Sequence, residues 1–104
     1  MSVVQIPFLF TFKDAMLSGK KTMTTRTKRW AKEGDTFLAF GRSFRIKSVV
    51  EMNLGRVAYE FFSEEGFDAA EDFIETWNTL HPRKLWNLEQ KVFSHSFELI
   101  KNEI

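Results

Sequence analysis

The sequence contains no cysteine and only two histidines, two prolines and five glycines. Without cysteine, disulfide bonds and thiolate chemistry are both excluded. The two histidines, His81 and His95, are too few and too scattered to indicate a metal site, and we expect neither a metal nor a cofactor. No apolar run approaches the roughly 20 residues that span a bilayer, and the N-terminus lacks the features of a signal peptide. The expectation is a soluble, cytoplasmic protein that does not contact a membrane.

Aromatic side chains are abundant, with twelve Phe, three Trp and one Tyr. Most are expected in the core, because aromatic residues bury the largest apolar area, and a few are expected to line a pocket for a flat ligand. Phe73, Trp77 and Leu80 have the spacing of one helix face and are expected in the core. The length fits one domain over residues 1–104. The oligomeric state is left open, with a monomer as the default expectation.

The charge is nearly balanced, at +1 overall, but the two signs are separated along the chain. Residues 20–32 contain six basic residues and no acid, whereas residues 51–75 contain eight acids against the single Arg56. A basic strip on a near-neutral domain is compatible with a local phosphate contact. The alternative interpretation is two oppositely charged, solvated surfaces.

The alternation and spacing of apolar residues predict an α+β domain with a mixed or antiparallel sheet. A parallel sheet is not favoured, because the strands are not regularly separated by crossover helices. The predicted strands cover 3–4 with 8–12, 21–27, 36–40, 44–50 and 92–100. The predicted helices cover 13–18, 53–62 and 68–80.

Cap and turn residues set the expected boundaries of these elements. Gly19 is placed to end the first helix, and residues 41–43 are placed to form a hairpin turn. Asn53 is expected to cap the second helix. Asp68 and Glu71 have the spacing of a capping pair at the start of the third helix.

Two segments carry side chains from which an active site could be built. Residues 19–26, with the sequence GKKTMTTR, place amines, hydroxyls and a guanidinium within one short stretch. Residues 64–67, with the sequence EEGF, add carboxylates just before a predicted helix. Together the segments provide a base, a nucleophile, a holder for an anion and a proton carrier.

The spacing of Gly19, Lys21, Thr24 and Arg26 resembles the G-x-K-x-x-T-x-R signature of the ASCH family, the activating-signal-cointegrator homology domains. The resemblance extends over most of the chain. It includes a K-x-G-D turn, an EGF-D segment with the helix after it and the closing strand, at residues 32–36, 65–82 and 92–99. It implies a small mixed or antiparallel β-barrel of PUA-like type, with flanking helices over its openings and a cleft at one side. It also implies binding of RNA or nucleotides.

Small bacterial members of the family, similar in length to this chain, are amidohydrolases that remove the acyl group from N4-acetylcytidine. In those members a lysine, a threonine and a glutamate carry the chemistry, and by position these correspond to Lys21, Thr24 and Glu65. The resemblance therefore implies that these three residues are catalytic and that a modified nucleoside is the substrate.

Amide hydrolysis needs a nucleophile, a base, a proton donor for the leaving amine and a group that holds the oxyanion. Thr24 can supply a hydroxyl, and Lys21 can act as base only if its pKa falls from about 10.4 toward neutrality. Glu65 could protonate the leaving nitrogen, and the adjacent Glu64 is an alternative for this role. The rigid fork of Arg26 suits an oxyanion, a carbonyl or a phosphate.

Lys20 and Thr22 complete the predicted substrate- or anion-binding set around Arg26. On a regular strand Thr22, Thr24 and Arg26 share one face, whereas Lys21 points the other way. Lys21 can converge on Thr24 only if the chain is still in the turn that precedes the strand.

A binding module is the second class of function that the sequence allows. Lys28, Arg29 and Lys32 surround Trp30, and a free nucleoside has no phosphate for these cations to neutralise. In this interpretation the same cleft binds single-stranded RNA, either without catalysis or in a form that cleaves the RNA. Trp30 and Trp86 are the candidates for an exposed stacking surface.

The candidate residues also have structural interpretations. Lys21 could be an ordinary solvated lysine, and Glu65 could simply stabilise the positive end of the following helix. Arg26 could form an ion pair with the acidic helix region. His95 lies on the apolar face of its strand and is expected to be a hydrogen-bonded core residue, whereas His81 is expected in a helix-ending turn.

Overall fold

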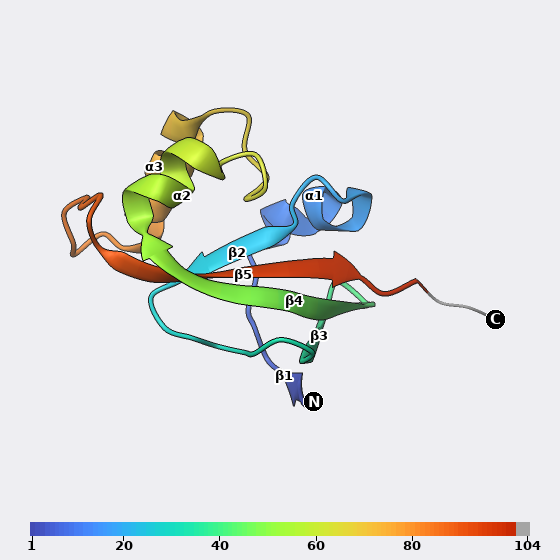
Figure 1. Cartoon of the computed structure of the whole chain (residues 1–104). Helices are drawn as coiled ribbons and strands as arrows, with labels where there is room; N and C mark the ends of the chain where they lie inside the picture. The colour runs from blue at the N-terminus through green and yellow to red at the C-terminus, as the bar shows by residue number, and fades with distance from the viewer. Residues whose placement is uncertain (102–104) are drawn as a thin grey trace.

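A five-stranded mixed sheet organises the protein (Figure 1). The structure is a computed structural model that describes residues 1–101. The strands are β1 (Val3–Val4), β2 (Met23–Arg26), β3 (Thr36–Ala39), β4 (Arg42–Asn53) and β5 (Lys91–Leu99). The helices are the short 3-10 helix η1 (Phe10–Phe12) and the α-helices α1 (Lys13–Ser18), α2 (Leu54–Glu60) and α3 (Ala70–Leu80).

The strands follow the order β1-β3-β4-β5-β2 across the sheet. β1 runs parallel to β3, and the other neighbours are antiparallel, so the predicted α+β class with a mixed sheet is confirmed. The sheet is not closed into a barrel, because β1 and β2 form its two edges and do not pair with each other within the described part of the chain. β2, which carries the signature residues, is therefore an edge strand.

The helices lie toward the two ends of the long strands β4 and β5 (Figure 1). α1 lies toward the end at which β5 finishes, and α2 with α3 lies toward the end at which β4 runs directly into α2. β2 follows α1 in the chain, and its side chains line a pocket together with those of α3. The edge strand β2 is therefore joined to α1 by the chain and faces α3 across the pocket.

Two apolar clusters form the core. The first, called here the phenylalanine cluster, centres on Phe37, Phe44 and Phe97, whose ring centroids lie 5.2, 5.4 and 5.6 Å apart. The second packs α2 and α3 against the far ends of β4 and β5, with the buried members Met52, Leu54, Val57, Ala58, Phe73, Trp77 and Val92. The prediction for Leu80 was wrong, because this last residue of α3 is 50% exposed.

The segment 8–12 does not form the predicted strand. β1 ends at Val4, and Phe10–Phe12 forms a turn of 3-10 helix that leads directly into α1. Pro7, which lies between β1 and this segment, cannot donate a backbone hydrogen bond to a strand ladder and so disfavours a strand that continues through it. The phenylalanines of this segment instead turn inward or outward one by one, and Phe10 is 76% exposed.

The caps agree only in part with the predictions. Gly19 ends α1 in the left-handed conformation, with φ of 84°, as predicted. Asn53 occupies the N-cap position of α2 but makes no side-chain cap hydrogen bond. Asp68 does not cap α3, whose N-cap residue is Ala69. Its carboxylate instead accepts a hydrogen bond from Lys20 at 3.0 Å.

The hairpin between β3 and β4 turns one residue earlier than predicted. Phe40 and Gly41 both have positive φ, at 53° and 76°, which is the geometry that two-residue hairpin loops favour. β4 then runs to Asn53 rather than ending near residue 50, and its pairing with β5 shifts register between Ile46 and Ser48.

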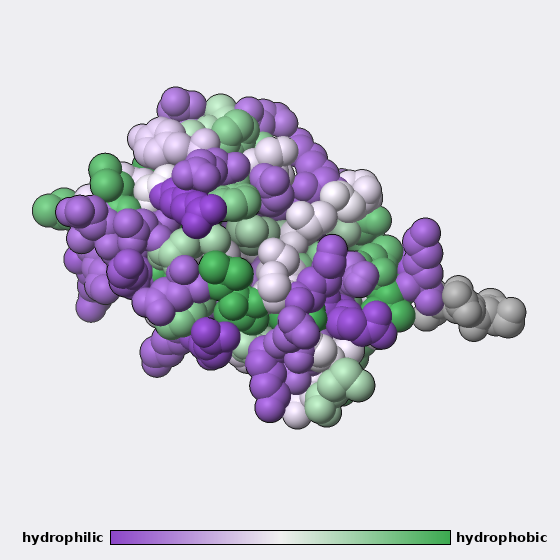
Figure 2. All heavy atoms as spheres, in the orientation of Figure 1, coloured by the Kyte–Doolittle hydropathy of each residue, from purple (hydrophilic) through white to green (hydrophobic). Residues whose placement is uncertain are grey.

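Apolar side chains are exposed at the end of the molecule that carries the loop between α3 and β5. Leu85 and Leu88 of this loop are 93% and 53% exposed, and Figure 2 shows hydrophobic spheres at this end. None of the helices within residues 1–101 is long and apolar enough to cross a membrane. Over the same residues, no three His, Cys, Asp or Glu side chains gather in a group that could hold a metal ion.

Candidate active site

A pocket of about 400 Å³ opens between β2, α3 and the segment around η1. Its walls are largely aromatic, with contributions from Phe8, Phe12, Trp30, Phe67, Phe73 and Trp77. Its polar lining consists of Lys21, Thr24, Thr25, Arg26, Thr27, Glu65, Thr76 and His81. An apolar pocket of this volume with a few convergent polar groups is typical of a small-molecule site.

A group of buried polar residues, called here the polar cluster, lies beside and beneath this pocket. Its members come from β2, β5 and the two segments next to them: Lys21, Thr24, Thr25, Glu65, Ser94 and His95. No buried side-chain nitrogen or oxygen within residues 1–101 lacks a hydrogen-bond partner. The cluster is therefore internally satisfied, as buried polar groups must be if the fold is to tolerate them.

Lys21 and Glu65 form a buried ion pair within the polar cluster. Nζ of Lys21 lies 3.3 Å from Oε1 of Glu65, and the two side chains are only 2% and 5% exposed. The same nitrogen donates to the carbonyl oxygens of Met23 and Glu65, each at 2.8 Å. It also lies 4.4 Å from the ring centroid of Phe12. Three acceptors for three N–H bonds, with a ring alongside, are the environment of an ammonium ion.

Burial lowers the pKa of Lys21, while the neighbouring carboxylate of Glu65 opposes this effect and the charge of Arg26 adds to it. The direction is the one that a lysine needs to act as a general base near neutral pH. Lys21 is therefore not the solvated lysine of the structural interpretation.

Backbone hydrogen bonds bring together the two segments that carry the candidate site residues. The carbonyl oxygen of Glu64 accepts the N–H groups of Thr22 and Met23, at 2.8 and 3.0 Å. The N–H group of Lys21 donates to the carbonyl oxygen of Ala15 at 2.8 Å, so Lys21 still belongs to the turn after α1. The condition for Lys21 to enter the pocket is thus met, because β2 begins only at Met23.

Gly66 allows the close approach of these segments. Its φ of 101° is one that side chains with a Cβ rarely adopt. A Cβ at this position would also lie 3.0 Å from Cβ of Lys21. The glycine is thus required both by the turn that aims Glu65 inward and by the lysine chain that passes beside it.

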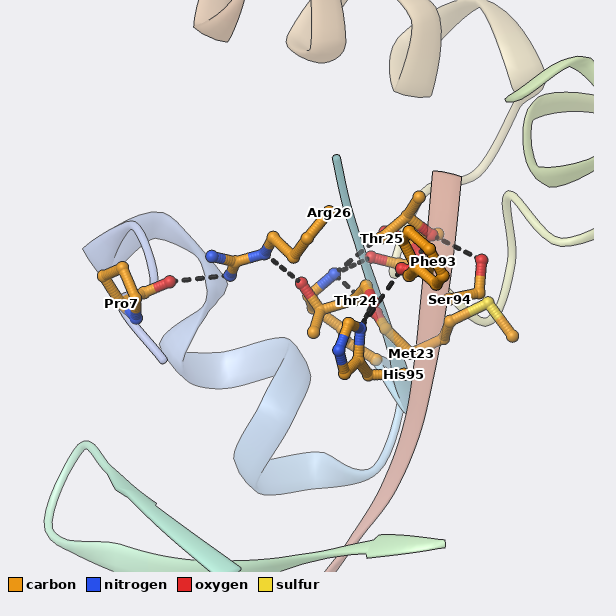
Figure 3. A network of polar contacts seen from close by, with 10 residues as sticks. Pro7, Met23, Thr24, Thr25, Arg26, Phe93, Ser94 and His95 are labelled. Carbon is orange, nitrogen blue, oxygen red and sulfur yellow. Dashed lines mark hydrogen bonds and ion pairs between the residues drawn. The ribbon is translucent and has the colours of Figure 1, made fainter. Parts of the chain in front are cut away.

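Thr25 and Ser94 supply the second contact of the Glu65 carboxylate. Oγ1 of Thr25 lies 2.6 Å from Oε2 of Glu65. The same oxygen lies 2.8 Å from Oγ of Ser94 (Figure 3). Thr25 and Ser94 are directly opposite each other in the pairing of β2 with β5. Because the one hydroxyl proton of Thr25 is donated to the carboxylate, Ser94 is the donor in the second bond.

Arg26 engages the Thr24 hydroxyl. Its Nε donates to Oγ1 of Thr24 at 3.1 Å, and its Nη2 donates to the carbonyl oxygen of Pro7 at 2.6 Å (Figure 3). The guanidinium lies over the rings of Phe8 and Trp30, 5.1 and 5.7 Å from their centroids. Burial lowers the pKa of Arg26, but an arginine stays charged in proteins. The predicted alternative, an ion pair with the acidic helix region, is not formed among residues 1–101.

His95 supports the site from behind, as the hydrogen-bonded core residue that was predicted. Its Nε2 accepts the backbone N–H of Trp30 at 3.0 Å, so the ring proton must be on Nδ1. That Nδ1–H faces the carbonyl oxygens of Phe93 and Thr24, at 3.1 and 3.3 Å (Figure 3). Burial lowers the pKa of His95 and keeps the ring neutral. The imidazole of His95 is therefore bonded to the backbone of both Thr24 and Trp30, two residues that line the pocket.

The structure brings together four of the predicted site residues and leaves three aside. Lys21, Thr24, Arg26 and Glu65 all line the pocket, whereas Glu64 is exposed. Of the substrate-binding set, Lys20 and Thr22 do not line it. Lys20 is bonded to Asp68 outside, and Thr22 lies in the turn before β2.

The predicted RNA-contact residues divide in the same way. Lys28, Arg29 and Lys32 are exposed outside the pocket, and the guanidinium of Arg29 lies 5.3 Å from the ring centroid of Phe93. Trp30 lines the pocket and is 42% exposed, as a stacking residue should be. Trp86 is not at the pocket and packs against the helical core.

Several residues of the pocket and of the polar cluster were missed by reasoning from the sequence. Thr25 and Ser94 carry no signal in one sequence, since their contact depends on the register between two strands far apart in the chain. His81 was predicted only as part of a helix-ending turn, yet it lines the pocket and stacks on Trp77 at 4.1 Å. The length of α3 could have indicated this, because residues Trp77 and His81 are one helical turn apart.

Known structures share this fold. An ASCH domain from Lactobacillus crispatus superposes with a TM-score of 0.75 at 14% identity, over 94% of this chain and 78% of that one. A protein from Enterococcus faecalis gives 0.63 at 22% identity, over 86% and 70% of the two chains. A protein from Pyrococcus furiosus gives 0.62 at 18% identity, over 97% and 96%. No protein-family model matches the sequence, and no curated protein matches it.

The chain thus has the fold of an ASCH domain, and the resemblance found in the sequence is confirmed at the level of the fold. Identities of this size concern the fold and not the chemistry of the pocket.

Proposed function

We propose that the protein is an ASCH-family amidohydrolase that cleaves the N-acyl amide of nucleosides of the N4-acetylcytidine type. One observation carries the proposal. A buried Lys21–Glu65 ion pair shares an aromatic pocket with the hydroxyl of Thr24 and the guanidinium of Arg26. These are the four groups that amide hydrolysis needs, and the identity of the nucleoside rests on the family resemblance.

The shape and lining of the pocket favour a flat, uncharged ligand. Aromatic rings on several sides offer stacking surfaces for a base, which is typically worth about 1–3 kcal/mol per base. The Arg26 guanidinium uses two of its five N–H groups on protein acceptors, which leaves donors for a ligand carbonyl. The acyl oxygen is the natural acceptor, since negative charge develops there during attack.

The ion pair can produce a base and an acid in one step. Movement of one proton from Nζ of Lys21 to Oε1 of Glu65, over 3.3 Å, converts ammonium and carboxylate into amine and carboxylic acid. The amine can then take the proton of the Thr24 hydroxyl as that oxygen attacks the acyl carbon. The carboxylic acid can give its proton to the leaving nitrogen as the C–N bond breaks.

The first half of the reaction leaves the acyl group as an ester on Thr24, with Lys21 protonated and Glu65 ionised. Transfer of the same proton from Lys21 to Glu65 again yields a base, which can activate a water molecule for attack on the ester. As the ester bond breaks, the protonated Glu65 gives its proton to the Thr24 oxygen, which restores the hydroxyl and the ion pair and releases the carboxylic acid. Each proton that is taken up is thereby given back within the cycle.

The test is incubation of the purified protein with N4-acetylcytidine, with cytidine release followed by chromatography. Lys21→Ala and Thr24→Ala are expected to abolish turnover. Lys20→Ala is the matched control, because Lys20 is the adjacent lysine but lies outside the pocket, and this variant should keep full turnover. Hydrolysis that persists in both Lys21→Ala and Thr24→Ala would refute the assigned roles, and a folded wild-type protein without hydrolysis would refute the proposed activity.

Binding of single-stranded RNA is a second candidate function, favoured by the exposed cations beside the pocket mouth. Lys28 and Arg29 precede the half-exposed Trp30 directly, so a nucleotide stacked on that ring would have phosphates near two positive charges. The affinity for a short RNA should then fall with salt, with a slope of about 0.7 per phosphate contacted. A slope near zero that is also unchanged in a Lys28→Ala/Arg29→Ala variant would exclude this function.

A further inference from the structure

The two oxygens of the Glu65 carboxylate have different partners. Oε1 faces the Lys21 ammonium at 3.3 Å, and Oε2 accepts the hydroxyl of Thr25 at 2.6 Å. The shorter bond is therefore the one to the neutral hydroxyl. A carboxylate held at one oxygen can still rotate about its last bond, whereas one held at both oxygens has a fixed plane.

Ser94, which is bonded to Thr25, is buried and held by strand pairing in the same way as Thr25. Ser94 is 1% exposed and Thr25 7% exposed, and the two are paired across β2 and β5. Their hydroxyls are 2.8 Å apart. Backbone pairing sets the distance between the side chains, so the Ser94–Thr25–Glu65 chain needs no ordering when a ligand binds.

The neighbouring threonines of β2 have separate partners. The hydroxyl of Thr24 is bonded to Arg26 and lies at the pocket, whereas the hydroxyl of Thr25 is bonded to Glu65 and Ser94. The Thr25 proton is already donated to a carboxylate. Thr25 is therefore suited to hold Glu65 and not to attack a substrate.

We propose that Thr25, backed by Ser94, is a positioning residue that fixes the Glu65 carboxylate so that its Oε1 stays within proton-transfer distance of Lys21. The proposal rests on the function proposed above. A threonine hydroxyl is well suited to this task, because Oε2 remains an acceptor for its proton when Oε1 takes a proton from Lys21. Thr25 can thus keep its contact with Oε2 whether Glu65 is ionised or protonated.

The experiment compares Thr25→Val with Thr25→Ser. Valine has nearly the shape of threonine and suits a strand, but it lacks the hydroxyl, whereas serine keeps the hydroxyl. With N4-acetylcytidine as substrate, Thr25→Val is expected to lower kcat about ten- to hundredfold, the factor that one hydrogen bond to a charged group can supply. KM should change by no more than about twofold, since Thr25 acts through Glu65 and not on bound substrate.

The pH profile separates positioning from a general structural defect. Displacement of the carboxylate weakens the charge that raises the pKa of Lys21, so the alkaline limb of the kcat profile should move to lower pH in Thr25→Val. Thr25→Ser should keep the wild-type profile and a kcat within about threefold of wild type. A structural defect alone would lower kcat without moving the limb.

A second measurement needs no turnover. The Lys21 side chain can be titrated by NMR in the ligand-free protein, through its Cε and Nζ signals. Because Glu65 raises the pKa of Lys21 against the effect of burial, release of the carboxylate should move the Lys21 midpoint to lower pH in Thr25→Val and not in Thr25→Ser.

The two measurements distinguish failure of this inference from failure of the proposed function. A wild-type protein inactive on N4-acetylcytidine whose Lys21 midpoint still shifts in Thr25→Val would refute the activity but uphold the positioning role. An unshifted midpoint in folded Thr25→Val would overturn the positioning role, whatever the activity. Equal loss of activity in Thr25→Val and Thr25→Ser would overturn it as well, since the hydroxyl would not be the group that matters.

Discussion

The phenylalanine cluster and the polar cluster lie on the same sheet, share strand β5 and are held together in opposite ways. Phe97 belongs to the first and Ser94 and His95 to the second, within four positions of one strand. In the phenylalanine cluster the rings of Phe37 and Phe44 stack at 5.2 Å, and no contact depends on a particular atom. In the polar cluster each oxygen and nitrogen has a specific partner.

The difference shows where stability and function reside. Burial of one phenylalanine side chain stabilises the fold by roughly 1.5–3 kcal/mol. A buried ion pair such as Lys21–Glu65 gives little net stability, because the cost of removing two charges from water offsets their attraction. The polar cluster must therefore be held in place by its surroundings. Its value lies in the geometry and protonation that it maintains.

The largest loss of stability is expected when one partner of the Lys21–Glu65 ion pair is removed. Lys21→Met leaves the buried Glu65 carboxylate without its counter-charge, and we expect a loss of about 3–5 kcal/mol in the free energy of unfolding. Chemical denaturation measures this loss. Addition of Glu65→Gln should then recover most of it, because the double variant buries no charge.

Lys20→Met provides the control for this cycle. The Lys20–Asp68 pair has side chains that are 51% and 85% exposed, and its removal should cost less than about 1 kcal/mol. A double variant no more stable than Lys21→Met would show that the unpaired charge is not the cause of the loss.

Removal of a ring from the phenylalanine cluster should cost stability without changing the chemistry of the pocket. Phe44 is fully buried, and Phe44→Ala is expected to lower the free energy of unfolding by about 3–5 kcal/mol through the cavity that it leaves. The Lys21 midpoint in NMR titration of the folded fraction should stay as in wild type. Phe10→Ala, at a residue 76% exposed, should change stability by no more than about 0.5 kcal/mol. A shifted Lys21 midpoint in Phe44→Ala would show that the two clusters are coupled.

Two glycines sharpen the comparison, because they share a positive φ but differ in what surrounds them. Gly19→Ala has no atom within 4 Å of the new Cβ and should cost only the backbone strain, about 1–2 kcal/mol. Gly66→Ala adds a 3.0 Å approach to Cβ of Lys21 and should cost more than Gly19→Ala in the same denaturation experiment. It should also lower turnover of N4-acetylcytidine, which Gly19→Ala affects less. Equal costs would mean that Lys21 moves aside without penalty.

Prediction from the sequence was less accurate for the phenylalanine-rich segment 8–12 than for the segments that carry Lys21 and Glu65. The turn at Gly19 follows from local rules, as does a carboxylate in the segment 64–67. The pocket contains Lys21 from the first segment and Glu65 from the second. The strand predicted at 8–12 failed because apolar alternation alone does not distinguish a strand from a short 3-10 helix with an exposed phenylalanine. Asp68 failed as a cap because a lysine 48 residues away binds its carboxylate.

What no local pattern contains is the register between β2 and β5. That register places Thr25 opposite Ser94 and Thr24 opposite His95. Four buried polar residues of the site thus become neighbours through a pairing between segments about seventy positions apart. Sequence reasoning found Thr24 and missed Thr25, the threonine that is bonded to the Glu65 carboxylate.

The smallest expected effect concerns His95, the histidine of the polar cluster. Its pKa in the folded protein lies below the ordinary value of 6.5, because burial disfavours the imidazolium. Between these two values the unfolded chain binds more protons than the folded one, so stability is complete above pH 6.5 and falls as the pH drops toward the folded pKa. The slope for one group cannot exceed about 1.4 kcal/mol per pH unit.

Protonation of His95 would put a proton on Nε2, which then could no longer accept the N–H of Trp30. Tryptophan fluorescence should therefore change over the same pH range as stability, since Trp30 lines the pocket wall that this bond fixes. His95→Gln offers a side chain without this titration, so its stability should lose the additional slope below pH 6.5. A wild-type protein with the same slope as His95→Gln would show that the polar cluster tolerates the charged ring. In that case the polar cluster, like the phenylalanine cluster, would not depend on one particular set of atom-to-atom contacts.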